Sequence, residues 1–152
     1  MKSKSLIVLL AAIFPLLGCA SAPLPDETGS WQTLRLEDSP PTRDLLLACE
    51  YAIEMAGYPK GETVPRRGTV SSDWLVNLQP FRNKGMRYQG ILRIFSNDGK
   101  VVVKSRVIAE RNIEMSDTLD PGAAEWEPTS DDIGRSRTLL QFLRSQLYLR
   151  DN

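Results

Sequence analysis

The side chains best suited to chemistry in this sequence are carboxylates, because the 152-residue chain has no histidine and only two cysteines. Without histidine there is no Ser-His-Asp or Cys-His nucleophile system and no histidine-containing zinc site. Five carboxylates lie between residues 111 and 130: Glu114, Asp117, Asp120, Glu125 and Glu127. Paired carboxylates suit glycan cleavage and clustered ones suit Ca²⁺, but the spacing and central glycine of a calcium loop are missing. We predict a solvated loop, no metal, no cofactor, no catalytic residue and hence no enzyme.

The two cysteines have different surroundings. Cys49 ends the apolar run Leu45-Leu46-Leu47-Ala48-Cys49, without a basic neighbour that would activate a thiol, so we interpret it as a small core residue. Cys19 follows the first apolar segment of the chain. If Cys19 is modified, no internal disulfide is possible.

The chain begins with the layout of a secretory signal. Lys2 and Lys4 precede an uninterrupted apolar run over residues 6–14, which is too short to span a bilayer as a mature helix. The segment closes with Leu16-Leu17-Gly18-Cys19, which resembles the lipobox of bacterial lipoproteins at all its positions. The resemblance implies cleavage before Cys19, lipidation of Cys19 and contact with a membrane through that lipid.

The residues after Cys19 bear on localisation. Ala20 is not the Asp that retains enterobacterial lipoproteins in the inner membrane, so the resemblance implies the periplasmic face of the outer membrane. Ala20-Ser21-Ala22 is also an ordinary cleavage pattern, and cleavage after Ala22 would give a soluble periplasmic protein. Residues 20–30 have linker composition and reach about 35 Å at most. We predict a signal peptide over 1–18, a lipidated flexible tether over 19–30 and one domain over 31–152.

The composition of the mature chain fits a single globular domain. Removal of residues 1–18 leaves 17 basic and 19 acidic side chains, a net charge of −2, which gives no preference for nucleic acid. Hydrophobic residues make up 41% of the sequence, which is enough to form a core.

Hydrophobic periodicity predicts four strands and two helices. Alternation of polar and apolar residues places the strands at 31–37, 69–78, 85–95 and 101–109. We expect Ser39 or Thr42 to cap the first helix, which ends at Gly57, and Ser130 to cap the second. Residues 58–67 between the first helix and the next strand are expected to be a loop. Each helix has an apolar stripe at helical spacing: Leu45, Leu46, Cys49, Ala52, Ile53 and Ala56 on the first, and Ile133, Leu139, Leu140, Leu143 and Leu147 on the second. Asn97-Asp98-Gly99 predicts a tight hairpin turn. The order β-α-β-β-β-α predicts an α+β fold, a four-stranded antiparallel sheet with two helices on one face.

Two strand segments are similar to those of a known family. The segments are Thr69-Val70-Ser71-Ser72-Asp73-Trp74 and Gly85-Met86-Arg87-Tyr88-Gln89-Gly90. They look like strands of the helix-grip domains of BamC (NlpB), an accessory lipoprotein of the outer-membrane β-barrel assembly machinery. The resemblance extends over about residues 40–150 and implies a helix-grip-like fold. That family has two such domains, whereas this chain has room for one.

The sheet face opposite the helices is the candidate binding face. We expect Trp74, Tyr88, Leu92 and Val103 to face the helices. The residues proposed for binding lie on the other face: Arg87, Ile91, Arg93, Phe95, Lys104 and Arg106. Arginine among apolar neighbours suits a protein partner, and the excess of basic residues suits an anionic ligand. A solvated face with scattered hydrophobic residues is the remaining alternative.

These patterns predict a non-catalytic, membrane-anchored lipoprotein that acts as an accessory or scaffold in outer-membrane and envelope biogenesis. Its partners would be the membrane, through the N-terminal lipid, and an envelope-assembly protein. The alternative is a binding module for an anionic envelope ligand, a glycan or lipopolysaccharide, on the open basic sheet face. Neither hypothesis involves nucleic acid.

Overall fold

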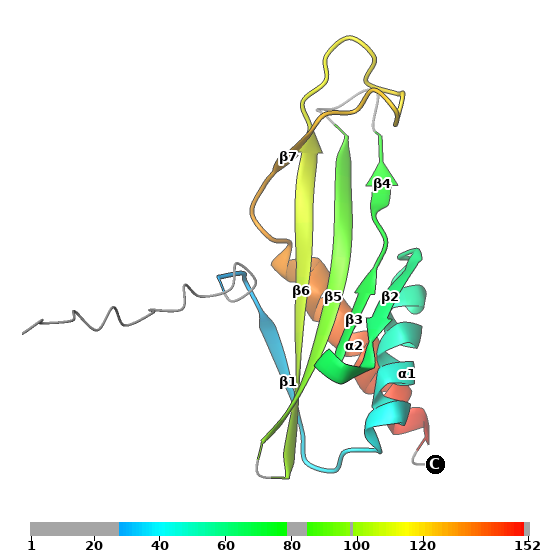
Figure 1. Ribbon diagram of the computed structural model, residues 1–152, viewed down its shortest axis with the longest axis vertical. Helices are drawn as coiled ribbons and strands as arrows, with labels where there is room; N and C mark the ends of the chain where they lie inside the picture. The colour runs from blue at the N-terminus through cyan, green and yellow to red at the C-terminus, as the bar shows by residue number, and fades with distance from the viewer. Residues whose placement is uncertain (1–27, 79–84, 98, 151–152) are drawn as a thin grey trace, which may run out of the picture.

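The computed structural model of the chain describes residues 28–78, 85–97 and 99–150 (Figure 1). The expected signal peptide, Cys19 and the tether as far as residue 27 lie outside the described residues, so the predictions made for them stay predictions. Across the described part of the chain, no helix is long and apolar enough to cross a bilayer.

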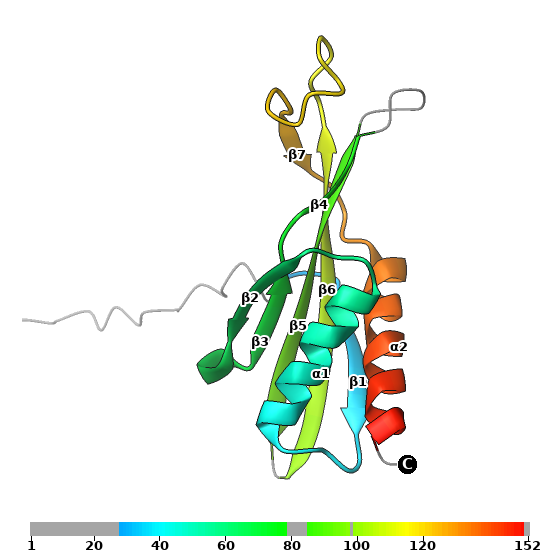
Figure 2. The ribbon, with the colours of Figure 1, turned by 90° about the vertical axis from the view of Figure 1, so that its right-hand side faces the viewer.

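The described residues form one antiparallel sheet of seven strands and two long helices. The strands are β1 (Gln32–Leu36), β2 (Lys60–Val64), β3 (Thr69–Ser72), β4 (Leu75–Asn77), β5 (Met86–Asn97), β6 (Lys100–Asn112) and β7 (Trp126–Pro128). The helices are α1 (Thr42–Met55), α2 (Ile133–Arg150) and the short 3₁₀ helix η1 (Pro65–Arg67). The α+β class and the antiparallel sheet with both long helices on one face are confirmed (Figures 1 and 2). The prediction of four strands is wrong, because β2 and β7 join the sheet and the strand expected at 69–78 is divided into β3 and β4.

The β5–β6 hairpin is the centre of the sheet. Its strands pair without interruption from Met86↔Arg111 to Asn97↔Lys100. Gly99 has a φ of +75°, as the expected tight turn requires. The strand order is β1-β6-β5-β3-β2, so β1 and β2 form the two edges.

The helices cover only half of this hairpin. β1 and β3 flank the half nearest the turn, where α1 and α2 pack, whereas β4 and β7 flank the other half. This second half extends beyond the helices (Figure 2). It consists of β4, β7, residues 86–89 and 108–112 and the loop 113–125, and we name it the projecting half.

One apolar core lies between the helices and the sheet. Its fully buried side chains come from α1, the sheet and α2: Leu45, Cys49, Ile53, Leu92, Val103, Val107, Leu139 and Leu143. The apolar stripes expected on both helices are therefore confirmed, with Ile133 as the exception. Helical side chains tilt toward the N-terminus, and Ile133 is the first residue of α2, so its side chain extends past the helix and is exposed.

Both helices begin differently from the prediction. α1 follows Pro41, whose carbonyl accepts the N–H groups of Asp44 and Leu45, and no side chain caps it. The N-cap of α2 is Asp132, because its Oδ1 accepts the N–H of Arg135 at 2.9 Å. Ser130 comes too early in the chain to be the N-cap. The residues on both sides of it, Thr129 and Asp132, still donate backbone hydrogen bonds to carbonyls of β6, so the helix begins only after Asp132.

Residues 58–67 were expected to be a loop, and this prediction is wrong. They form β2 and η1, with β2 paired to β3 at Thr63↔Val70 and Val64↔Thr69. β2 is an edge strand whose first three residues are exposed, so its sequence does not show the alternation of a half-buried strand.

A one-residue bulge separates β3 from β4. Ser71 pairs with Ile91 and Leu75 pairs with Tyr88. The chain therefore advances by four residues from β3 to β4 while the partner strand β5 advances by three, which leaves one extra residue in the bulge. The bulge reverses the alternation of side chains, which places Leu75 on the helix side and Trp74 on the open face. The expectation that Trp74 faces the helices is therefore wrong.

Polar contacts hold the bulge. The N–H of Gly90 donates to Ser72 Oγ at 2.9 Å instead of to a strand carbonyl. The freed carbonyl of Ser72 accepts a hydrogen bond from Gln89 Nε2 at 3.0 Å. The backbone groups displaced from the ladder thus find partners on side chains.

The first prediction concerns Cys49. Burial, and to a smaller degree the charge of Glu50, raises the pKa of its thiol to about 12. In a Cys19→Ser chain we expect a thiol reagent at pH 8 to label Cys49 only as the protein unfolds, with the same denaturant midpoint as circular dichroism. A Ser145→Cys variant, at an exposed position of α2, provides the control and should label at once. Rapid labelling of native Cys49 would contradict the core assignment.

Candidate functional site

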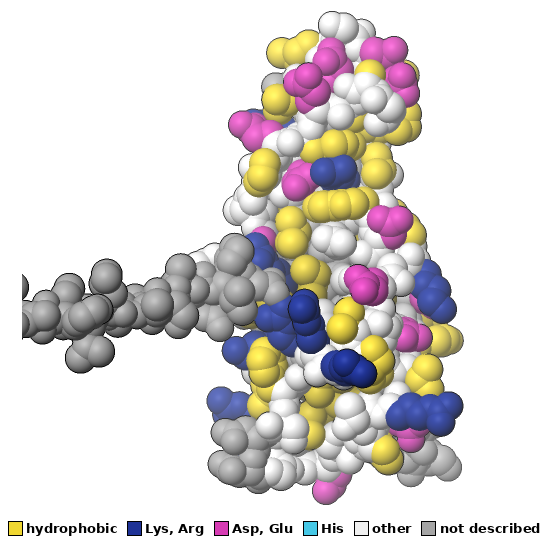
Figure 3. Space-filling view, in the orientation of Figure 1, with side chains coloured by type: hydrophobic (Ala, Val, Ile, Leu, Met, Phe, Trp, Pro, Cys, Tyr) yellow, Lys and Arg dark blue, Asp and Glu magenta, His cyan; other side chains and the backbone are white. Residues whose placement is uncertain are grey.

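All six residues proposed for binding lie on the open face of the sheet. The register pairs Arg87 with Glu110, Ile91 with Arg106 and Arg93 with Lys104, so alternate residues of β5 and β6 share this face. Figure 3 views the molecule from this side. Their positions divide between the two halves of the hairpin, and their contacts differ.

Arg87 belongs to the projecting half and is enclosed by two tryptophans. Its guanidinium carbon lies 4.2 Å from the ring centroid of Trp74 and 4.7 Å from that of Trp126. Its Nε donates to Glu110 Oε2 at 2.6 Å. The guanidinium thus contacts two tryptophan rings and a carboxylate of the same chain, and these contacts give Arg87 a structural role.

Neither tryptophan was recognised from the sequence as a partner of Arg87. Trp74 reaches the open face only because of the bulge, and Trp126 stands in β7, inside a segment expected to be a loop. Trp126 pairs with Asn112, which places it beside Arg87 and Glu110 across the sheet. The presence of Trp126 in an otherwise polar segment is the sequence feature that indicates a packed position there.

Arg106 is also engaged within the protein. Its Nε and Nη2 donate to the two carboxylate oxygens of Asp131, at 2.8 and 3.1 Å. The side chains are 17% and 8% exposed, so the pair is largely removed from water. A bidentate arginine–carboxylate pair of this kind fixes geometry as well as charge.

This ion pair also binds the two residues that come shortly before β1, Gly29 and Ser30. The N–H of Ser30 donates to Asp131 Oδ2 at 2.6 Å. Gly29 lies directly on the arginine, since a Cβ at this position would come within 2.2 Å of Arg106 Nε. Gly29 and Ser30 therefore lie against the open face of the sheet.

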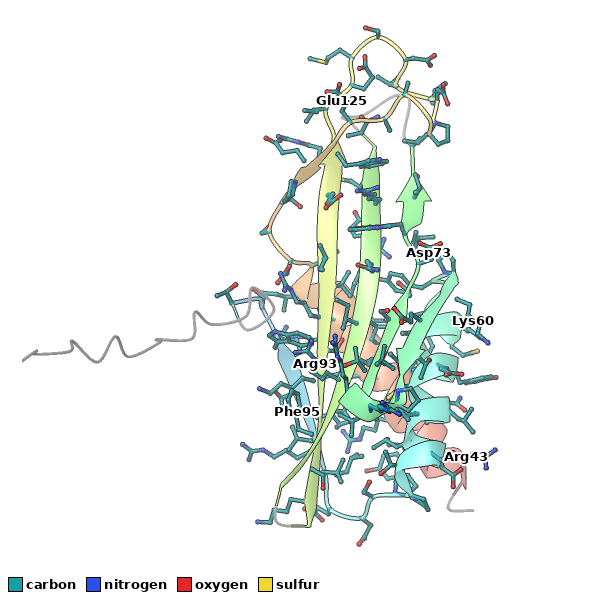
Figure 4. All side chains as sticks on the ribbon, in the orientation of Figure 1. Arg43, Lys60, Asp73, Arg93, Phe95 and Glu125 are labelled. Carbon is teal, nitrogen blue, oxygen red and sulfur yellow. The ribbon has the colours of Figure 1, made fainter. Side chains whose placement is uncertain are left out.

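A basic-aromatic patch occupies the open face below this point. We define it as Trp31, Arg93, Phe95 and Lys104, two of which are labelled in Figure 4. The Arg93 guanidinium carbon lies 5.2 Å from the Trp31 ring centroid, and Lys104 Nζ lies 5.1 Å from that of Phe95. Arg35 extends the patch, because β1 places it beside Val102 on the same face. Blue side chains gather over this region in Figure 3.

The acidic loop uses its carboxylates in its own turns. Glu114 accepts the N–H groups of Met115 and Ser116, and these hydrogen bonds hold the pKa of its carboxyl below its usual value. Asp120 accepts the N–H of Gly122, and Glu127 pairs with Arg111. Within the described ranges, no group of three His, Cys, Asp or Glu side chains is placed to hold a metal ion.

A hollow of about 560 Å³ lies between the end of β1 and the end of α2. Leu34, Leu36 and Leu147 give it an apolar floor, and Tyr148 stands at its side with Arg144 Nη2 donating to its hydroxyl at 3.3 Å. Leu34 and Leu36 point to the helix side of β1, whereas Arg35, which also lines the hollow, lies on the open face beside the patch.

Comparison with known proteins gives no further guide to the site. No family model matches the chain, and no curated protein matches it. The described residues form an α+β domain whose open antiparallel face carries an enclosed arginine, the contact between the Arg106–Asp131 pair and Ser30, and a basic-aromatic patch.

The second prediction compares two ion pairs. Asp131→Ala removes the carboxylate that neutralises a largely buried arginine and that binds Ser30. We expect the free energy of unfolding to fall by about 2 kcal/mol, less than the roughly 3–5 kcal/mol typical of fully buried pairs, because Arg106 keeps some contact with water. Chemical denaturation of the purified protein measures this loss.

Glu127→Ala is the matched control. The Arg111–Glu127 pair has a similar length, 2.7 Å, but its side chains are 47% and 49% exposed. We expect its removal to cost less than about 1 kcal/mol, as for other exposed pairs. Equal losses for the two variants would show that burial of Arg106 and Asp131 does not matter.

Proposed function

We propose that this protein is a non-catalytic, lipid-anchored accessory protein in envelope biogenesis, held on the periplasmic face of the outer membrane by Cys19, and that its projecting half contacts an envelope-assembly protein. The observation that carries the proposal is the exposure of large apolar side chains on this half. Met115 is 75% exposed and Leu119 is 56% exposed, both in the loop at its end. Exposed apolar groups rimmed by charged ones are typical of protein contacts.

The construction of the projecting half supports a role in binding. It lies beyond the helices and contributes little to the core, so folding alone does not explain its length. The stack of Trp74, Arg87 and Trp126 fastens β4 and β7 to the central hairpin. A surface held in one conformation loses less entropy when a partner binds.

The resemblance to the BamC helix-grip domains gives separate support to the envelope role. The lipobox pattern and the two strand segments are the features on which it rests. The resemblance implies the order helix, three strands, helix, and α1, β3, β5, β6 and α2 follow one another in that order, with β2 and β7 as further strands.

Binding of an anionic glycan or lipopolysaccharide over the whole open face is the second candidate. The four basic residues at Arg87, Arg93, Lys104 and Arg106 motivate it. Because Glu110 neutralises Arg87 and Asp131 neutralises Arg106, a binding site spread over the face has less charge to offer.

The third prediction tests the anchor. Cys19→Ala removes the thiol to which the lipid would be attached, so we expect the protein to move from the membrane pellet to the soluble fraction and to lose incorporation of labelled palmitate. Cys49→Ala is the matched control and should stay in the membrane fraction. A Cys19→Ala protein that remains membrane-bound would refute the anchor.

The fourth prediction tests the projecting half. A photo-crosslinking amino acid at position 115 should give an adduct with an envelope-assembly protein in living cells, identified by mass spectrometry. The same group at position 55, a half-exposed methionine on α1, should not give this adduct. Identical adducts from both positions, or none from position 115, would contradict the proposed contact surface.

A further inference from the structure

The outward face of α1 carries an apolar stripe that the core does not use. Leu47, Tyr51 and Met55 are 44%, 46% and 49% exposed, although the helix already buries a full stripe against the sheet on its other side. Their spacing of four residues places them in one row along the helix, the kind of ridge that packs into the groove of a facing helix. We name these three residues the outer stripe.

The neighbouring helix shows that such a stripe is not a general property of the helix layer. α1 and α2 lie side by side over the same half of the sheet (Figure 2). The exposed positions in the middle of α2 are polar: Arg137, Thr138, Gln141, Arg144 and Ser145. Large apolar side chains that are exposed singly are ordinary, whereas three in a row on one helix indicate a contact surface.

Opposite charges stand at the two ends of the outer stripe. Arg43 precedes it by one turn at the N-terminal end of α1, where Figure 4 labels it, and Glu54 lies beside Met55 at the C-terminal end. Both charged side chains are exposed, and within residues 28–78, 85–97 and 99–150 neither forms an ion pair. A row with a positive and a negative end is complementary to itself when a second copy runs in the opposite direction.

We propose that the outer stripe is the interface of a homodimer, in which α1 packs antiparallel against α1 of a second copy. A two-fold axis near residue 49 brings Leu47 of each copy beside Tyr51 of the other. The same axis brings Arg43 of each copy beside Glu54 of the other, so the dimer contains both contacts twice. The outer stripe lies on the helix side of the sheet, so the open face and the projecting half stay accessible (Figure 2). Dimerisation through α1 thus adds to the envelope role and is independent of a lipid anchor.

The test, the fifth prediction, uses the chain from residue 19 with Cys19→Ser, which contains every described element and cannot be lipidated. One pair of helices buries little area, so we expect a dimer with a dissociation constant on the order of 10–100 μM, measured by sedimentation equilibrium. Leu47→Ser with Tyr51→Ser should leave the protein monomeric. Met115→Ser with Leu119→Ser is the matched control, because it removes two exposed apolar side chains from the projecting half, and it should keep the dimer.

Charge reversal tests the antiparallel arrangement. Arg43→Glu alone, or Glu54→Arg alone, places like charges opposite each other at both ends of the dimer, so each should raise the dissociation constant about 10-fold. The double variant restores opposite charges and should return the constant to within about 2-fold of the parent value. A mixture of the two single variants should form a heterodimer, because both contacts between the two chains then join opposite charges.

Three results would overturn the proposal. They are a parent chain that stays monomeric at millimolar concentration, an equal loss of the dimer in the outer-stripe and control variants, and a double charge variant that dimerises as weakly as the single ones. Circular dichroism and the denaturation midpoint verify that each variant is folded. These assays contain neither membrane nor envelope protein, so their failure leaves the fractionation and crosslinking results unaffected, and failure of the envelope role leaves the dimer unaffected.

Discussion

The ladder between β5 and β6 is the constraint on which the other elements depend. Its pairs run from Met86↔Arg111 to Asn97↔Lys100, well beyond the part that the helices cover. A β-ribbon without an apolar layer against it is only marginally stable in water. The stack of Trp74, Arg87 and Trp126 supplies a small layer of its own on the open face, with each cation–π contact contributing about 0.5–2 kcal/mol. The core and the projecting half are therefore stabilised by different chemistry along one hairpin.

Sequence patterns correctly predicted those elements that depend only on neighbouring residues in the chain. The stripe of α1, the end of α1 at Gly57 and the turn at Gly99 follow from side-chain period and backbone freedom, and the structure confirms them. The bulge after Ser72 has a distant cause, hydrogen bonds to residues 89 and 90, so no window around Ser72 reveals it. β2 lacks alternation because it is an exposed edge, and only pairing with β3 makes it a strand.

The sequence predicted which face of the sheet carries the candidate binding residues, but not which of them have partners inside the protein. Alternation placed Arg87 and Arg106 on the open face, and the register confirms this. Their carboxylate partners are Glu110 and Asp131, which are 23 and 25 residues away along the chain. A count of charges made from the sequence treats both arginines as available to bind a ligand. In the structure, Glu110 and Asp131 neutralise them. Tertiary pairing, which a single sequence does not display, thus neutralises two of the four basic residues that were counted on this face.

The distribution of charge connects the separate features of the molecule. The basic-aromatic patch and the Arg106–Asp131 pair lie on the half of the hairpin that the helices cover, while Glu114, Asp117 and Asp120 lie in the loop of the projecting half. Acidic and basic side chains are thus separated along the hairpin, even though the net charge of the chain is close to zero. The positions of the charges, rather than their sum, therefore distinguish the two ends of this small domain.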